Sequence, residues 1–384
     1  MNKKKIKLVI LSLLDFMEEI NAISVEKNKY KNKDRIEICN SVKLTKDQTN
    51  DIEEFYKKNY GKKIPLDWHK SYMAFTGNFD VKYIPEFLFI PKFERYMNYN
   101  KSLADVLEDK NLLYIFANKL NVRMPKKIIS CQDGIYSDSD NNILSFDQAV
   151  GFLKNIGECF SKPSIGSDSG RGCEVHNYQN GIDTKTGEDC SKSLYNMGDN
   201  FVIQERLICH ESVRKIYPNS VNTFRIMTYR WHNEIVTAPV IMRIGQGGAY
   251  LDNAHAGGMF IALSNDGELH KKAFTEFNKS YEIHPDSNLK FEGYKIELFP
   301  NVLETAKKMH SLLPSIGVIN WDMTIDESGN PTIIEANVNC GSIWLFQMAH
   351  GCGVFEERTS EILKWIRKME KGGYAYRQVH HYGD

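Results

Sequence analysis

The chain has 384 residues, of which 42% are hydrophobic and 26% charged, a balance typical of globular proteins that bury a core in two or three lobes. Its 49 basic residues match its 49 acidic residues, and this zero net charge argues against nucleic-acid binding driven by bulk charge. We therefore expect no nucleic-acid partner. No apolar run approaches the ~18 residues that a membrane-spanning helix needs, so we also expect no stable membrane insertion.

The N-terminus shares some features with an export signal. Three lysines at positions 3–5 precede an apolar run over residues 6–14. Lys7 interrupts this run, acids follow from Asp15, and no small-x-small cleavage site is present. We therefore predict a soluble amphipathic helix, with an export or membrane-surface segment as the alternative. The eight cysteines include no CxxC pair and are typical of reduced thiols, so we expect a cytoplasmic protein.

The first 108 residues have helical periodicity, many aromatic residues and few glycines. Asp47–Tyr60 is predicted to be a helix that ends before Gly61. Aromatic residues cluster over residues 68–89, and we interpret them as the core of a helical region. A surface that docks an acceptor is the alternative interpretation. No catalytic motif lies in this zone.

From residue 109 onward, predicted strands and helices alternate irregularly, which favours an α+β fold with antiparallel sheets. The polar stretch Asn180–Asn200 is predicted to be a mobile loop. The predicted helices are Asn111–Leu120, Phe146–Ile156, Pro300–Leu313 and Val354–Glu370. The predicted strands are Lys126–Ser130, Cys159–Pro163, Cys173–Tyr178, Phe201–Leu207, Asn222–Trp231, Glu234–Arg243, Gly258–Leu263, Val318–Ile325 and Pro331–Ala336.

The strongest candidate site lies in the last two predicted strands, which a turn over residues 326–330 joins into a hairpin. In such a hairpin Asp322 and Glu335 become near neighbours across the strands, about 5 Å apart at Cβ. Asn337 projects from the same strand face as Glu335. Two carboxylates and an amide oxygen without a basic partner require a cation between them, and such hard ligands suit Mg²⁺. Ordinary surface acids on a solvated hairpin are the alternative.

A second pattern begins with a lysine at the end of a predicted strand. Lys162 precedes the Gly/Ser loop Gly166–Gly172, which contains Ser167, Ser169 and Gly170. Glycines let backbone N–H groups approach phosphate oxygens, and the lysine adds a positive charge. The pattern indicates phosphate binding without being a Walker A loop, although a plain hairpin connection also explains it.

Two further patterns concern strand ends. Phe201–Leu207 ends in polar residues that suit the edge of an adenine, with Glu211 placed for ribose hydroxyls, although an ordinary strand exit explains this equally well.

Arg225 and Arg243 lie in otherwise apolar strands, where an unpaired guanidinium is costly. They either pair with structural acids or face an anionic ligand in a cleft, and we favour the ligand.

Taken together, these residues resemble the ATP-grasp superfamily of carboxylate–amine ligases. The spacing of Asp322, Glu335, Asn337 and Gly341 is similar to the D-alanine–D-alanine ligase pattern, which implies that the first three bind Mg²⁺ and that Gly341 binds substrate. Asn253 resembles the first residue of an Asn-x-x-x-Gly-Gly element that lines the reacting groups. The resemblance implies that ATP is bound by Lys110, Lys162, Ser167, Ser169, Gly170, Gln204, Glu205, Leu207 and Glu211, and substrate by Asn253, Gly257, Gly258 and Gly341.

More narrowly, Asn222–Arg225 together with Asp252–Gly258 resembles the sugar-transfer-associated ATP-grasp proteins, a group linked with polysaccharide biosynthesis. The resemblance implies that two α+β lobes, at residues 109–211 and 212–384, hold ATP between them. The helical region 1–108 lies outside it.

Two departures from the D-alanine ligase pattern concern arginines. Asn320 stands where those ligases have one arginine, and Leu251-Asp252 stand where the second is expected. Arg225 and Arg243 are candidate substitutes. The identity of the arginine that stabilises the transition state therefore stays open.

The resemblance implies an ATP-dependent ligase that forms an amide through an acyl phosphate, with Arg225, Arg243, Asn253 and Lys162 at the reacting groups. The expected partners are a small-molecule carboxylate and an amine, with a sugar-linked substrate as one option. A kinase that phosphorylates a hydroxyl and a non-catalytic nucleotide-binding protein are the rival hypotheses. The substrates, the role of residues 1–108 and the oligomeric state stay open.

Overall fold

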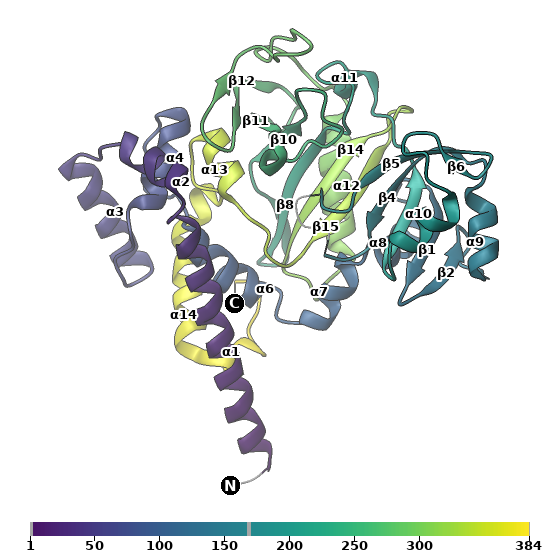
Figure 1. Cartoon of the computed structure of the whole chain (residues 1–384). Coiled ribbons are helices and arrows are strands. Elements are labelled where there is room, and N and C mark those ends of the chain that lie inside the picture. The colour runs from purple at the N-terminus through teal and green to yellow at the C-terminus, as the bar shows by residue number, and fades with distance from the viewer. Residues whose placement is uncertain (1–2, 167–169, 384) are drawn as a thin grey trace.

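The computed structural model describes residues 3–166 and 170–383 of the chain. In this part of the chain the strands form two antiparallel sheets, as expected for the α+β class. Figure 1 shows the first sheet beside the second, with the helices of residues 33–76 on the far side of the second sheet.

The first sheet has the strand order β3-β2-β1-β7-β4-β5-β6 among the described residues. Helices α9 (Phe146–Leu153) and α10 (Cys190–Asn196) cover it and share a small apolar core with its strands. A capping box at Ser145 and Gln148 starts α9. The strands are β1 (Lys127–Gln132), β2 (Ile135–Asp138), β3 (Ile143–Leu144), β4 (Gly157–Pro163), β5 (Glu174–Gln179), β6 (Ile182–Asp183) and β7 (Phe201–Glu205).

The prediction of a mobile loop over Asn180–Asn200 is wrong, because this stretch contains β6 and α10. Asp189 starts α10 by accepting a hydrogen bond from the Ser191 backbone N–H at 2.8 Å. Leu194 is buried, and its neighbour Ser193 is hydrogen-bonded to Tyr178. The sequence analysis missed α10 because the segment is mostly polar and only a few of its apolar residues are buried.

The second sheet has the order β13-β12-β11-β10-β8-β14-β15 among the described residues, with β9 paired to β8. Every residue of its strand β14 is buried, because one apolar core covers each face of the sheet. The strands are β8 (Thr223–Trp231), β9 (Glu234–Thr237), β10 (Val240–Ile244), β11 (Met259–Leu263), β12 (Leu269–Thr275), β13 (Ser280–Tyr281), β14 (Val318–Ile325) and β15 (Pro331–Asn337).

Several predicted boundaries need correction. The single strand expected over Glu234–Arg243 is two strands, β9 and β10, because Pro239 between them lacks the N–H that a continuous ladder needs. The last helix begins at Thr359 rather than Val354. Strands β12 and β13 and helix α13 (Trp344–His350) were not predicted.

The N-terminal region is helical, as predicted, and its aromatic residues form a core with the other end of the chain. Trp68, Tyr72 and Phe93 pack in the same cluster as Phe346 and Trp365.

None of the helices among the described residues is both long and apolar enough to cross a membrane. The helical elements are α1 (Lys3–Lys29), α2 (Lys33–Ser41), α3 (Lys46–Asn59), α4 (Asp67–Thr76), α5 (Glu86–Leu88), the π-helical turn η1 (Phe89–Glu94), α6 (Arg95–Met97), α7 (Lys101–Glu108), α8 (Lys110–Lys119), α11 (Glu211–Arg214), α12 (Phe299–Ser311) and α14 (Thr359–Arg377).

Candidate active site

A cavity of about 1140 Å³ is lined by residues of both sheets. Such a cavity is large enough for a small-molecule ligand. The structure brings many of the candidate residues from the sequence to this one place. Those that line the cavity are Lys110, Lys162, Gly170, Gln204, Leu207, Arg225, Arg243, Asn253, Asp322, Glu335 and Asn337.

The predicted hairpin is confirmed: β14 and β15 are antiparallel neighbours, and Asp322 lies directly opposite Glu335. On the other side of β14, Asp322 lies opposite Arg225 of β8. Directly paired residues point to the same face of a sheet, so the three side chains form a row across three strands. Sequence spacing predicted the two acids of this row, but the place of Arg225 depends on which strand lies next to β14.

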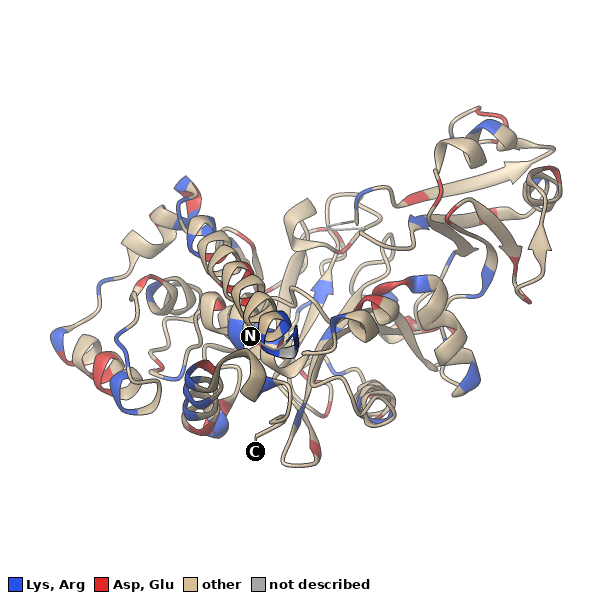
Figure 2. Cartoon of the chain, turned by 90° about the horizontal axis from the view of Figure 1, so that it is seen from below, with Lys and Arg blue, Asp and Glu red and all other residues tan. Residues whose placement is uncertain are grey.

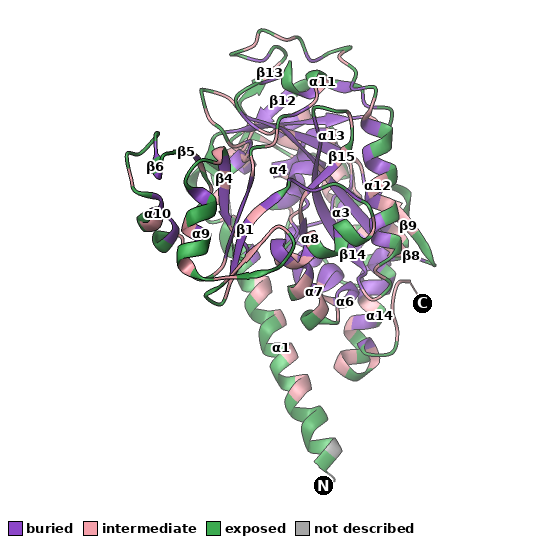
Figure 3. Ribbon diagram, turned by 90° about the vertical axis from the view of Figure 1, so that its right-hand side faces the viewer, coloured by how far each residue is buried: buried purple, intermediate pink, exposed green. Residues whose placement is uncertain are grey.

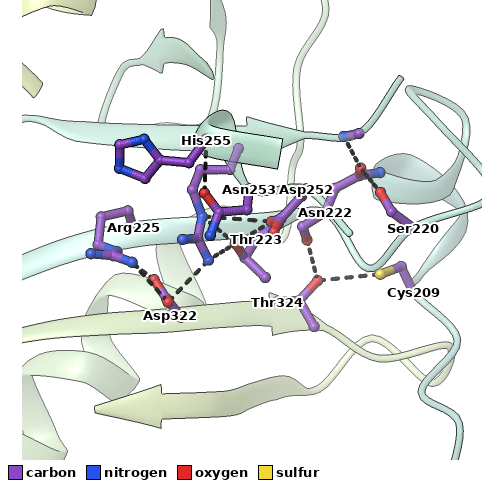
Figure 4. A network of polar contacts seen from close by, with 12 residues as sticks. Cys209, Ser220, Asn222, Thr223, Arg225, Asp252, Asn253, His255, Asp322 and Thr324 are labelled. Atoms are coloured by element: carbon purple, nitrogen blue, oxygen red, sulfur yellow. Dashed lines mark hydrogen bonds and ion pairs between the residues drawn. The ribbon is translucent and has the colours of Figure 1, made fainter. Parts of the chain in front are cut away.

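The two arginines pair with the buried Asp322 carboxylate. Arg225 Nη2 donates to Asp322 Oδ2 at 2.9 Å, and Arg243 Nη2 lies 3.0 Å from the same oxygen. Figure 4 shows Arg225 and Asp322 pointing toward one another from neighbouring strands. The expectation that the acids lack a basic partner is therefore wrong. Of the two interpretations of the arginines, the structure shows the pairing with an acid. Both arginines also line the cavity, and their contact with an anionic ligand stays a prediction.

Arg243 is held by a second set of contacts. Its Nε and Nη2 donate to Thr223 Oγ1 at 3.0 and 2.9 Å, and its Nε lies 3.7 Å from Asp252 Oδ2. Thr223 in turn donates its backbone N–H to Asp252 at 2.9 Å. Burial alone would lower the pKa of Arg243, but Asp252 and Asp322 outweigh it and raise that pKa. The result is a fixed positive charge at the cavity wall.

Glu335 stays ionised. Burial raises its pKa, but the positive charges of Lys110, Lys162 and Arg225 lower it more, to about 2. Lys110 Nζ lies 3.5 Å from Glu335 Oε2. The Asn337 side-chain nitrogen donates to the Asn320 carbonyl at 3.1 Å, which leaves the amide oxygen as its acceptor atom.

These side chains fit a magnesium ion that is also bound by phosphate oxygens. Among the described residues no group of three or more histidines, cysteines or acids is arranged to hold a metal alone. Mg²⁺ in proteins is commonly held by one or two carboxylates together with substrate phosphates. Asp322, Glu335 and Asn337 supply two carboxylates and an amide at one cavity wall.

Lys110 and Lys162 are both buried and approach the same cavity from different elements. Lys110 begins α8, where its backbone N–H donates to Ser164 O at 3.0 Å. Lys162 lies in β4, and its Nζ donates to the Ile334 carbonyl at 3.3 Å. Burial, followed by repulsion from Lys110, lowers the pKa of Lys162 to about 8. Near neutral pH most of the Lys162 side chains therefore carry a proton.

If the cavity holds ATP, as the resemblance implies, we predict that kcat/KM for ATP falls as the pH rises through about 8. The lowered pKa means that Lys162 is charged below this value and neutral above it, so its attraction for phosphate is lost on the alkaline side, ~tenfold per pH unit. In the Lys162→Arg variant this alkaline decline should disappear, since a guanidinium stays charged. Steady-state kinetics from pH 6 to pH 10 test this, and a parallel decline in both proteins contradicts it.

The residues predicted for adenine and ribose separate into two groups. Gln204 and Leu207 line the cavity, whereas Glu205 and Glu211 do not. Glu205 accepts from the Lys126 backbone N–H at 2.9 Å, and Glu211 is exposed and lies 2.6 Å from Lys215 Nζ.

In the phosphate loop, Gly170 lines the cavity, whereas the predicted Ser167 and Ser169 lie outside the described residues.

The predicted substrate residues also divide. Asn253 lines the cavity and accepts from the His255 backbone N–H at 3.0 Å. Gly257, Gly258 and Gly341 are not part of the cavity lining. Gly258 packs so tightly that a Cβ would lie 2.5 Å from Asp252 O.

Gly341 serves the packing of the backbone. Its N–H donates to the buried Glu94 carboxylate at 2.6 Å, and a Cβ would collide with the Asn320 side chain. The structure therefore explains this glycine by close approach, and the substrate role predicted for it gains no support from its position.

One end of the cavity was missed by the sequence analysis. It is formed by the N-terminal region, which carries no recognisable motif and is distant in sequence from both sheets. Only the aromatic clustering there hinted at a docking role. The N-terminal residues that line the cavity are Glu26, Lys29, Tyr30, Arg35, Ile38, Ser71, Glu86 and Glu108.

Glu86 is the most unusual of these residues. One carboxylate oxygen accepts from Ser342 Oγ and from the Ile343 and Trp344 N–H groups at 2.7–2.9 Å. The other oxygen is buried and has no hydrogen-bond partner among the described residues. Burial, with a contribution from Glu26, raises the pKa of Glu86 to about 7. A buried acceptor of this kind is suited to a ligand that donates hydrogen bonds.

The family model described as "Sugar-transfer associated ATP-grasp" matches residues 91–363. No curated protein matches the sequence. Among solved structures, D-alanyl-alanine synthetase A of Vibrio cholerae is 12% identical with a TM-score of 0.40, over 68% of this chain and 64% of that one. D-alanine–D-alanine ligase of Bacillus anthracis is 15% identical with a TM-score of 0.35, over 69% and 70%. Carboxyaminoimidazole ribonucleotide synthase of Aspergillus clavatus, solved with ATP, is 10% identical with a TM-score of 0.35, over 61% of this chain and only 45% of that one.

Proposed function

The chain belongs to the sugar-transfer-associated ATP-grasp family, and from this premise we propose that it is an ATP-dependent carboxylate–amine ligase. The observation that supports the proposal most is one cavity whose wall carries the Asp322–Glu335 pair together with Arg225, Arg243, Lys110 and Lys162. This set of charges suits a triphosphate with its metal ion, because acids hold the metal and cations neutralise the phosphates.

In the proposed reaction the protein mainly positions the reactants and neutralises charge. Lys110 and Lys162 hold the phosphates of ATP, and Gln204 and Leu207 face its base. A carboxylate oxygen of one substrate bonds to the γ-phosphorus, ADP leaves, and an acyl phosphate forms. The amine nitrogen of the second substrate then bonds to the acyl carbon, phosphate leaves with the bonding electrons, and the nitrogen gives up a proton to the departing phosphate.

Arg225 and Arg243 both line the cavity and are proposed to face the phosphoryl group that is transferred. Asp322, Glu335 and Asn337 would hold Mg²⁺, which supplies positive charge at the phosphate oxygens when bound. Because Asp322 also fixes both guanidinium groups, it links the proposed metal site to the proposed phosphate site. Asn253 lies at the same cavity wall and is proposed to orient the reacting carboxylate.

The acceptor is proposed to occupy the end of the cavity formed by the N-terminal region. The buried, unpartnered oxygen of Glu86 favours a donor such as an amine or a sugar hydroxyl. Tyr30 and Trp344 add aromatic surface to the same lining. The family's association with sugar transfer supports a sugar-linked substrate and a role in cell-surface polysaccharide biosynthesis.

We predict that Glu86→Gln raises KM for the acceptor about tenfold and leaves KM for ATP unchanged. The amide oxygen can still accept the three hydrogen bonds that end on one oxygen of Glu86, but an N–H donor then replaces the other, unpartnered oxygen. Measuring both KM values in one assay separates the two ends of the cavity. An equal change in both would contradict the assignment of this end to the acceptor.

The proposed activity is tested by phosphate release from ATP, screened over amino acids, uronic acids and amino sugars, with mass spectrometry of the products. A ligase releases phosphate only when a carboxylate and an amine are both present, and an amide product appears. A phosphorylated product that persists without an amine would indicate a kinase instead. A protein without any MgATP-dependent thermal shift would not be an ATP-dependent enzyme.

A further inference from the structure

Helix α1 projects from the body of the protein, as Figure 1 shows. A surface helix of a globular protein normally turns its apolar stripe toward the core and its charged face toward water. In the outer two thirds of α1 this arrangement is reversed. Asp15 and Glu19 turn toward the protein, whereas a row of apolar residues is exposed to solvent.

The acids of α1 bind basic residues of the body. Asp15 Oδ1 lies 2.8 Å from Arg95 Nη2, and Glu19 Oε1 lies 2.8 Å from Lys92 Nζ. Glu18 also contacts Arg95, at 2.9 Å. These contacts anchor the helix by its polar face and neutralise its negative charges.

The opposite face of α1 is a continuous apolar surface, which we call the α1 apolar face. At 100° per residue its members fall within an arc of about 160°. Figure 3 shows this part of the helix as largely exposed. Its members, each between 40% and 59% exposed, are Ile6, Val9, Ile10, Leu13, Leu14, Phe16, Met17 and Ile20.

Positive charge lies at the end of this face. Lys3, Lys5 and Lys7 are exposed at the tip of α1, ahead of its first acid, Asp15. Figure 2 shows the Lys and Arg colour at this tip. An exposed apolar face next to lysines is the pattern of helices that lie in the interface of a bilayer with anionic lipids. Asp15, Glu18 and Glu19 would otherwise repel such lipids, but their negative charges are neutralised by ion pairs with the body of the protein.

We propose that the α1 apolar face docks the protein on the surface of a membrane that contains anionic lipids. The helix lies in the plane of the interface and does not cross it, in keeping with its length and charges. A second copy of the chain fits less well. The arc is wider than the seam of a two-stranded coiled coil, and a parallel pair would bring the lysine tips together. This proposal does not depend on the ligase activity.

The test is flotation of the full chain with vesicles of phosphatidylcholine, with and without phosphatidylglycerol. We expect binding to the vesicles that contain phosphatidylglycerol, weakened by added salt. Leu13→Gln/Met17→Gln should lower the partition coefficient at least about tenfold, and so should Lys3→Gln/Lys5→Gln/Lys7→Gln. The matched control is Ile143→Gln/Tyr195→Gln, which replaces two apolar side chains elsewhere that are even more exposed than Leu13 and Met17, and it should bind like wild type.

Several outcomes would overturn the proposal. These are no binding of the wild-type chain to either vesicle, equal binding with and without phosphatidylglycerol, or unchanged binding of Leu13→Gln/Met17→Gln. Light scattering after size exclusion addresses the second copy: a dimer that this double variant abolishes, without vesicle binding, assigns the face to self-association. Circular dichroism checks that each variant keeps its helices. These side chains are exposed, so the fold should not change.

Discussion

The Glu335→Gln variant is expected to turn over ATP about 10³-fold more slowly than wild type while keeping its fold. The substitution keeps the shape of the side chain and removes a negative charge that is held ionised at the cavity wall, since the pKa of Glu335 is lowered to about 2. Without this charge, the proposed magnesium site has a single carboxylate, and that carboxylate already pairs with two guanidinium groups. Lost electrostatic stabilisation of a transferring phosphoryl group is commonly worth two to three orders of magnitude.

The matched control is Glu327→Gln, on the exposed turn of the same hairpin. It removes the same charge from the same supersecondary unit, but outside the cavity, and should turn over ATP at the wild-type rate. Measurements of ATP turnover and of the thermal midpoint separate loss of chemistry from loss of fold. A Glu335→Gln enzyme with near wild-type turnover would show that this carboxylate does not serve the nucleotide.

The largest effect on stability is expected from Asn98→Ala. Asn98 is buried between the N-terminal region and the second sheet. Its side-chain nitrogen donates to the carbonyls of Val318 and Val338 at 2.8 and 2.7 Å, and its oxygen accepts from the N–H groups of Gly317 and Val318 at 2.8 and 2.9 Å. Alanine would leave these buried backbone groups without their partner. We expect a loss of about 3–5 kcal/mol.

Thermal unfolding followed by circular dichroism measures this loss, and we expect a midpoint roughly 5–10 °C below that of wild type. Asn196→Ala is the control, since Asn196 is exposed and its side chain makes one contact, with Glu188 at 3.2 Å. Its midpoint should stay close to the wild-type value. If Asn98→Ala also melts like wild type, then the four hydrogen bonds do not hold the N-terminal region to the sheet.

Local patterns predicted the elements that form the two walls of the cavity. Alternating apolar residues and a turn at 326–330 indicated the β14–β15 hairpin, and counting along it placed Asp322 opposite Glu335. The split of β9 from β10 was missed, although Pro239 was a visible signal. The position of α10 was missed because its composition is polar and only a few of its side chains reach a core.

Other parts of the site had no local signal at all. The pairing of Asp322 with Arg225 and Arg243 depends on the strand order β10-β8-β14. Glu86 reaches the cavity because the N-terminal helices pack on α13, more than 250 residues further along the chain. No spacing rule connects such residues.

By itself the sequence determined the α+β class, the hairpin with its two acids and the place of Lys162 in a strand, because backbone hydrogen bonding and side-chain alternation act over a few residues. Lys110 was identified only through the family resemblance. Only the tertiary structure decided which cations pair with Asp322, that Glu205 and Glu211 lie outside the cavity lining, and that the acids of α1 turn toward the protein. Each of these depends on the packing of segments that are distant in sequence. A charged side chain takes its partner from whatever such packing brings within a few ångströms of it.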